Sequence, residues 1–333
     1  MSFLPVSARL GALPWLSMVF AVVASPAWAD GLFTLKSEND IYSGGSDGHY
    51  TNGLEATWAF RTSPQHWLND LADWLPGWSR NSLDGGAYRL SHQLYTPIDI
   101  GEKSLDVSDR PYAGLFTAGV SLFDSEPHDD WRQLRSLNFD AGIVGPAAGG
   151  ETIQRELHHV LDSEKPEGWQ YQLHNEPVVN MSYKTSWIGR SALNGLEVEY
   201  GPSLGFALGN LYTYGATGGG VRIGENLSRS FGIPSIAPAE GGRSFFLPDR
   251  GFGWYAFAAL EGRYMAHNLL LDGNTFENSH SVDREEWVGD ALVGVAFNWD
   301  RWQLSVTHAW RTKEFHAQPK SDSFGSLSLA FWY

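Results

Sequence analysis

The 333-residue sequence contains no cysteine, so neither disulfide bonds nor cysteine-ligated metal centres can stabilise the protein. Beyond the N-terminal segment, no stretch approaches the roughly 18 uninterrupted apolar residues that indicate a transmembrane helix. Basic residues are also scarce, because 23 Lys and Arg stand against 38 Asp and Glu, a formal net charge of -15. This balance argues against a nucleic-acid partner and is compatible with a lumen and loops that hold cations.

The N-terminal segment has the three parts of a secretory signal peptide. Arg9 supplies a positive charge, residues 10–24 are apolar, and residues 27–29 form an Ala-Trp-Ala cleavage site. The alternative is an uncleaved anchor, but the apolar run is shorter than the roughly 20 residues that span a bilayer. We expect residues 1–29 to be cleaved, leaving one domain over residues 30–333. An exported chain without disulfides needs another source of stability, and a closed β-barrel is one.

Hydrophobicity alternates with a period of two along most of the chain. Over residues 196–208, one face carries Leu, Val, Tyr, Pro, Leu, Phe and Leu, while the other carries Glu, Gly, Ser and Ala. Such a strand has one apolar and one polar face. A soluble sandwich also alternates, but its strands tend to be shorter. These runs have the length of tilted membrane strands, roughly 10 residues or more, and large aromatic residues lie near their ends.

We therefore predict an all-β fold, a transmembrane antiparallel β-barrel of about 12 strands with a short helix in an extracellular loop. The composition of 37 Gly, 15 Trp and 13 Tyr suits a barrel with aromatic girdles, and the final strand ends in an aromatic residue, Tyr333. The strands are expected at residues 31–39, 50–62, 88–97, 111–124, 133–146, 174–187, 195–208, 212–222, 254–267, 286–299, 301–314 and 324–333.

Strand parity assigns the connections to the two ends of the barrel. With both termini in the periplasm, the outward loops are about 40–49, 98–110, 147–173, 209–211, 268–285 and 315–323. The tight turn Trp299-Asp300-Arg301 then falls on the periplasmic side, where short turns belong. Two links on that side, 63–87 and 223–253, are unusually long. The first contains a helical spacing of Trp and Leu over residues 67–75 that could rest on the membrane interface.

Oxygen-bearing side chains gather around the first outward loop. Asn39 and Asp40 end one strand, and Thr51 begins the next. Carboxylate, amide and hydroxyl oxygens suit a hard cation such as Ca²⁺, and to some degree Mg²⁺ or Mn²⁺. The alternative is a hairpin loop that is rich in Asn, Asp and Gly simply because turns favour these residues.

A second outward loop contains a candidate general base. A Gly-Gly pair precedes Ile153, Leu157, Val160 and Leu161, whose spacing predicts a short amphipathic helix. His158 lies late on that helix, and a chain reversal could bring the carboxylate of Glu164 to the imidazole, an arrangement typical of a general base. The alternative is a solvated surface helix. No G-x-S-x-G motif marks a serine nucleophile, so water activated by His158 is the simplest hydrolytic scheme.

Several motifs in fixed order resemble the lipid A 3'-O-deacylase (LpxR) family over essentially the whole mature chain. They are Asn39-Asp40, Tyr50-Thr51-Asn52-Gly53, Gln93-Leu94-Tyr95-Thr96-Pro97, Asp109-Arg110-Pro111-Tyr112-Ala113-Gly114, Gly145-Pro146, Gln154 to His158 followed by Glu164, Trp169, Gln172-Leu173 and Asn175-Glu176-Pro177.

The resemblance implies a twelve-stranded outer-membrane barrel and Ca²⁺-dependent hydrolysis of the 3'-linked acyloxyacyl chain of lipid A, the membrane anchor of lipopolysaccharide. It implies that His158 is the general base and Glu164 its partner, and that the polar residues of the first loop surround the cation and oxyanion: Asn39, Asp40 and Thr51. Lys103 is the nearest equivalent of a family lysine, offset by one residue. Arg110 could bind a lipid A phosphate through a bidentate pair or cap its loop.

Two other functions remain open at this stage. One is an outer-membrane phospholipase that uses the same rim on a different acyl ester. The other is a non-enzymatic barrel, a small pore or adhesin, for which we would expect a lumen lined with charges and no convergent rim site. The predicted lumen-facing residues are often small or hydroxylated, which does not exclude a pore. A monomer is compatible with the sequence, which leaves the oligomeric state and the preferred acyl length open.

Overall fold

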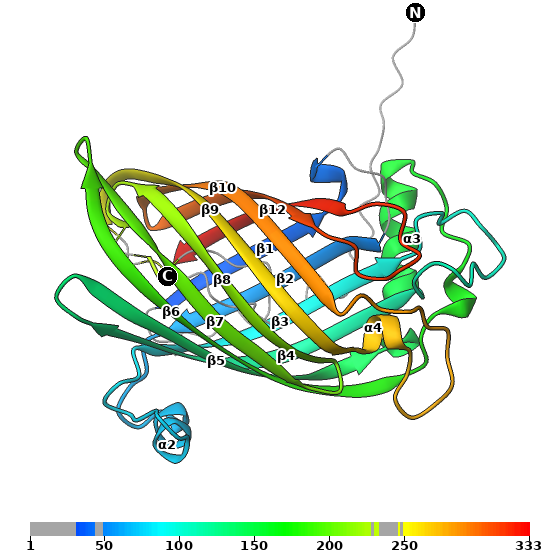
Figure 1. Ribbon diagram of the computed structural model, residues 1–333, viewed down its shortest axis with the longest axis horizontal. Helices are drawn as coiled ribbons and strands as arrows, with labels where there is room; N and C mark the ends of the chain where they lie inside the picture. Colours follow the sequence, from blue (N-terminus) through cyan, green and yellow to red (C-terminus); the bar gives the residue numbers. More distant parts are fainter. Residues whose placement is uncertain (1–30, 44–48, 228–229, 233–245, 247–248) are drawn as a thin grey trace, which may run out of the picture.

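The computed structural model describes residues 31–43, 49–227, 230–232, 246 and 249–333. Over these residues, twelve antiparallel strands pair in sequence order and close when β1 meets β12 (Figure 1). Their bounds are β1 Gly31–Asn39, β2 His49–Phe60, β3 Gly85–Thr96, β4 Ala113–Pro127, β5 Trp131–Val144, β6 Glu176–Leu193, β7 Leu196–Gly209, β8 Tyr212–Gly224, β9 Asp249–Asn268, β10 Trp287–Asp300, β11 Trp302–Arg311 and β12 Asp322–Trp332.

The predicted fold class and strand number are confirmed. The bounds differ most where hairpin arms run beyond the clear alternation, since β6 continues to Leu193 and β9 begins at Asp249. The predicted signal peptide, residues 1–29, lies outside the described residues. In the part of the chain that is described, no helix is long and apolar enough to cross a membrane.

The two ends of the barrel differ in their connections. The end that carries Gly31 and Tyr333, here called the terminal end, has tight turns such as Asn194-Gly195, where both residues have positive φ as an Asn-Gly hairpin requires. The predicted turn at Asp300 is confirmed, because Trp299 pairs directly with Trp302. The opposite end, the loop end, carries short helical segments: η2 Ile41–Ser43, η3 Pro146–Ala148, α3 Gly150–Leu161, η4 Trp169–Tyr171 and α4 Leu269–Asp272.

The alternating pattern sorts side chains between the outer wall and the lumen. In β7, apolar Tyr200, Leu204 and Leu208 are exposed, while Glu199 and Ser203 are buried. The exposed face is apolar because its solvent is lipid.

The lumen holds ion pairs beside the small and hydroxylated residues that the sequence indicates. Asp290 accepts hydrogen bonds from Arg263 at 2.7 Å and Arg311 at 2.8 Å, and Lys184 meets Glu261 at 2.6 Å. Arg263, Asp290 and Arg311 lie on the consecutive strands β9, β10 and β11, whereas Lys184 of β6 meets Glu261 of β9 across the lumen. Pairing is what makes buried charges tolerable.

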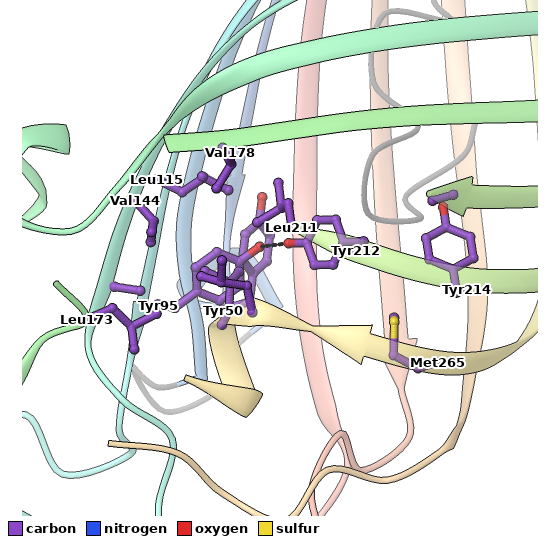
Figure 2. Close-up of a cluster of buried hydrophobic side chains, with 14 of the residues drawn as sticks. Tyr50, Tyr95, Leu115, Val144, Leu173, Val178, Leu211, Tyr212, Tyr214 and Met265 are labelled. Atoms are coloured by element: carbon purple, nitrogen blue, oxygen red, sulfur yellow. Dashed lines mark hydrogen bonds between the residues drawn. The ribbon is translucent and has the colours of Figure 1, made fainter. Parts of the chain in front are cut away.

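Within the described residues, clusters of packed side chains lie at both ends of the lumen. At the loop end, α4 contributes Leu269 and Leu270 to a buried apolar cluster in which the hydroxyls of Tyr95 and Tyr212 lie 3.4 Å apart (Figure 2). At the terminal end, Phe246 packs among lumen-facing residues, and its carbonyl accepts a hydrogen bond from Trp332.

The two long links at the terminal end have separate structural roles. Part of the 225–248 link folds into the lumen, where Arg222 donates to the carbonyls of Leu227 at 2.7 Å and Gly232 at 3.0 Å and pairs with Glu199. The other link forms the predicted helix, α2 Trp67–Trp74, which packs against the outside of the barrel.

Candidate active site

Helix α3 packs on the outer wall of the barrel near the loop end. Its first residue, Gly150, fits so closely that a methyl group there would lie 2.9 Å from Cα of Gly114 and 3.0 Å from Leu94. Leu94 and Gly114 pair across β3 and β4 on the lipid-facing side of the wall, the side of exposed Leu90 and Phe116. The helix therefore lies on the membrane side of the wall and not over the lumen.

The buried face of α3 is polar. Gln154 and His158, spaced one turn apart, are buried against the protein, and the side-chain oxygen of Gln154 accepts a hydrogen bond from the Trp169 indole at 2.7 Å. The apolar residues that predicted the helix, Ile153 and Leu157, are 38% and 41% exposed. The helix was predicted correctly, but its apolar face points away from the protein.

His158 is held by Glu164, through an atom that the sequence analysis did not expect. Asp162 adopts a left-handed conformation that ends α3, and the N–H groups of Asp162 and Ser163 both donate to the carbonyl of His158. The reversed chain places the main-chain carbonyl oxygen of Glu164 at 2.5 Å from Nδ1 of His158. The expected partner atom was the carboxylate, which instead lies so close to Gly101 that a Cβ there would clash with it.

This contact assigns the tautomer of His158. A carbonyl oxygen can only accept, so Nδ1 carries a hydrogen, and in the neutral imidazole Nε2 is then the nitrogen that lacks one. This orientation is compatible with a base that acts through Nε2.

The residues of the first loop lie on the same row of the wall as the start of α3. Asn39 pairs with Asn52, which pairs with Leu94, and two interstrand steps of ~4.8 Å separate Asn39 from Leu94. Thr51 is the extra residue of a β-bulge between Tyr50 and Asn52. Such a bulge re-aims a side chain, and here the Thr51 hydroxyl lies 2.7 Å from that of Thr96.

The oxygen ligands proposed for a cation are present but few. The side-chain oxygen of Asn39 accepts from the N–H of Ile41 at 2.8 Å, as a turn residue would, and an amide oxygen retains a second lone pair for a cation. Asp40 follows it and is 3% exposed. Among the described residues, no three Asp, Glu, His or Cys side chains gather around a common point. A cation here would depend on one carboxylate, neutral oxygens and bound water or substrate.

Lys103 lies in the loop that packs beside Glu164. Its carbonyl accepts from Gln170 at 3.1 Å, and the carbonyl of Ile100 in the same loop accepts from the N–H of Glu167 at 2.8 Å. The side chain of Lys103 is exposed. The structure thus brings Lys103 into the same loop cluster as Glu164.

Arg110 does not reach the surface, which corrects the expectation that it binds a phosphate there. Its side chain is 1% exposed, lies over the ring of Tyr95 at 4.6 Å and meets Glu314 at 3.4 Å. Its neighbour Asp109 anchors the loop: burial would raise the Asp109 pKa, but hydrogen bonds from His49 and from main-chain N–H groups outweigh burial and lower it. Closure of the barrel places Glu314 beside Arg110, so sequence spacing could not reveal the pair.

Two further residues contribute to the site, although the sequence motifs that contain them suggested no role for either. Thr96 is fully buried and partners Thr51, and Trp169 is fully buried between α3 and Tyr112. The only signal in the sequence was their position beside other polar or glycine-rich motifs.

The fold and this site define an outer-membrane β-barrel with a polar site on its lipid-facing rim. A family model described as "Outer membrane protein LpxR" matches residues 13–333, so the chain belongs to this family. None of the curated proteins matches the chain.

The chain is also similar to solved structures, of which the first named here shows the same fold. LpxR from Salmonella typhimurium matches with a TM-score of 0.73 and 20% identity, covering 91% of this chain and 100% of that chain. The KdgM porin matches with a TM-score of 0.41 and 6% identity, covering 91% and 99%. The translocator domain of the autotransporter NalP from Neisseria meningitidis matches with a TM-score of 0.40 and 8% identity, covering 96% and 94%. The last two similarities carry no argument about function.

Proposed function

We propose that this protein is a Ca²⁺-dependent hydrolase that removes the 3'-linked acyloxyacyl chain of lipid A. The observation that carries the proposal is His158, oriented through Nδ1 and located on the lipid-facing side of the wall. Family membership supports the same activity. A lipid substrate can reach this side without leaving the membrane. The loop end would face outward, because outer-membrane barrels carry their longer loops there.

In the proposed reaction, Nε2 of His158 takes a proton from water while the water oxygen attacks the ester carbonyl carbon. The bond from that carbon to the sugar oxygen then breaks, and the imidazolium returns the proton to the departing oxygen. The carbonyl of Glu164 stabilises the imidazolium through the Nδ1 hydrogen bond. The Thr51 hydroxyl, oriented by Thr96, would donate to the oxyanion.

Asp40 and Asn39 would hold the cation, whose charge would polarise the ester carbonyl. Because a single carboxylate contributes, affinity should fall in the weak range of extracellular Ca²⁺ sites, a Kd of about 10⁻⁴ to 10⁻³ M. Lys103 would meet an anionic group of lipid A as a point charge. The exposed ridge of Ile153, Leu157 and Val160 suits contact with acyl chains.

Mass spectrometry of lipid A from expressing cells tests the proposal. The wild-type chain should remove one acyloxyacyl unit, and His158→Ala or added chelator should each abolish that loss. His159→Ala is the matched control, because this neighbour is exposed on the same helix. Release of fatty acid from glycerophospholipids with unchanged lipid A would instead identify a phospholipase, and an unchanged profile of both lipids would exclude the hydrolase.

A further inference from the structure

Helix α2 is a docked element at the opposite end of the barrel from the active site. Leu68 and Ala72 pack against outward-facing Phe60 and Leu122, and a methyl group at Gly86 would clash with Leu68. The segment after the helix is fastened as well, because Arg135 of β5 donates to the carbonyl of Gly77 at 2.8 Å. These contacts fix α2 on the outer wall of the barrel.

The remaining surface of α2 carries two kinds of exposed side chain. Asp70 and Asp73 pair with Arg80 at 2.9 Å and 2.5 Å, which leaves one net negative charge. Trp67 and Trp74, two turns apart on one face that also holds Asp70, are 48% and 81% exposed. Among the described residues, Trp74 is the most exposed large hydrophobic side chain.

Exposed aromatic residues mark the terminal end of the wall on five other strands. They lie at the ends of β5, β9, β10, β11 and β12: Trp131, Phe252, Trp299, Trp302 and Tyr333. This is the position of an interfacial girdle, where aromatic rings lie at the level of lipid headgroups.

Over β2 and β3 the wall's own aromatic residues are at least partly covered. Phe60 is buried beneath α2, Trp58 and Tyr88 are partly buried, and the hydroxyl of Tyr88 accepts a hydrogen bond from the indole of Trp67 at 2.9 Å. The most exposed rings in this sector therefore belong to α2. Its tryptophans lie beside the wall, in continuity with the girdle of the other strands.

We propose that α2 is a lipid-binding element that inserts Trp67 and Trp74 into the headgroup–acyl boundary of the leaflet at the terminal end, completing the girdle over β2–β4. The partner is a glycerophospholipid surface, recognised by amphipathic rings rather than by charge, since Asp70 and Asp73 already pair with Arg80. Binding should therefore persist in zwitterionic lipid and at high salt. This proposal does not depend on the hydrolase activity.

The absence of cysteine permits a direct test with single nitroxide labels. Trp74→Cys, Leu260→Cys and Asn81→Cys are labelled in the full chain, folded into phosphatidylcholine vesicles, and their collision rates with oxygen and a polar nickel complex are compared. Leu260, 68% exposed on β9, is the lipid reference, and Asn81, exposed in the α2–β3 link, is the water reference. Heat-dependent gel mobility checks folding, and labelled Trp67→Cys gives the same readout if the first variant does not fold.

The ratio of oxygen to nickel collisions at position 74 should exceed that at position 81 severalfold and approach that at position 260, with no change on addition of salt. A ratio equal to that at position 81 would overturn the proposal, because the helix would then lie in water. Shielding from both reagents with spin–spin broadening would also overturn it, since a second copy of the chain would then cover α2.

Discussion

The contact between α3 and the wall allows a quantitative prediction for Gly150→Ala. The added methyl group would lie 2.7 Å from the Trp169 ring, and ordinary contact begins at 3.4 Å, so the helix must shift by about 0.7 Å. Overpacking of this kind costs about 1–3 kcal/mol, of which the better helix propensity of Ala offsets at most about 1 kcal/mol. A misplacement near 1 Å can reduce an enzymatic rate by about 100-fold.

We therefore expect Gly150→Ala to slow lipid A deacylation by about 10- to 100-fold while the barrel remains folded. The assay compares deacylation rates in vesicles by mass spectrometry and folding by heat-dependent gel mobility. Gly215→Ala is the matched control, because a methyl group at Gly215 meets no atom within 4 Å. A folded Gly150→Ala protein with the wild-type rate would refute the argument that the seating of α3 positions His158.

Two further predictions concern buried polar contacts. Thr51→Val should lower the deacylation rate at least about 10-fold, because it removes the hydroxyl and leaves Thr96 without this hydrogen-bond partner. Thr51→Ser keeps a hydroxyl and should retain most of the rate. Equal rates for the two variants would contradict a role for the hydroxyl. Arg222→Met should lower the free energy of unfolding, measured in urea, by about 3 kcal/mol. The substitution removes the positive charge beside buried Glu199 and the hydrogen bonds that Arg222 donates to several main-chain carbonyls. Arg190→Met should change the free energy of unfolding by less than about 1 kcal/mol, because solvent screens the half-exposed Arg190. Similar losses of stability in both variants would contradict the anchoring role of Arg222.

The wall of the barrel was predictable because its signal is local. Successive side chains of a strand point to opposite sides, so alternation in the sequence reports burial directly, and the turn at Asp300 and the strand number followed from it. The lumen was not predictable in the same way. Lys184 of β6 meets Glu261 of β9 only because the curvature of the barrel brings non-neighbouring strands face to face across the lumen, and the sequence contains no marker for that pairing.

Some features of the candidate site were likewise predictable from local sequence, and others were not. The sequence by itself determined the helix that bears His158 and predicted the reversal that brings Glu164 back, since both depend on residues within one short segment. Tertiary structure decided that the main-chain carbonyl of Glu164 contacts Nδ1, that the polar side of α3 faces the wall, and that Arg110 is buried beside Glu314. Those outcomes depend on surfaces contributed by distant strands, and local periodicity cannot specify which surfaces meet.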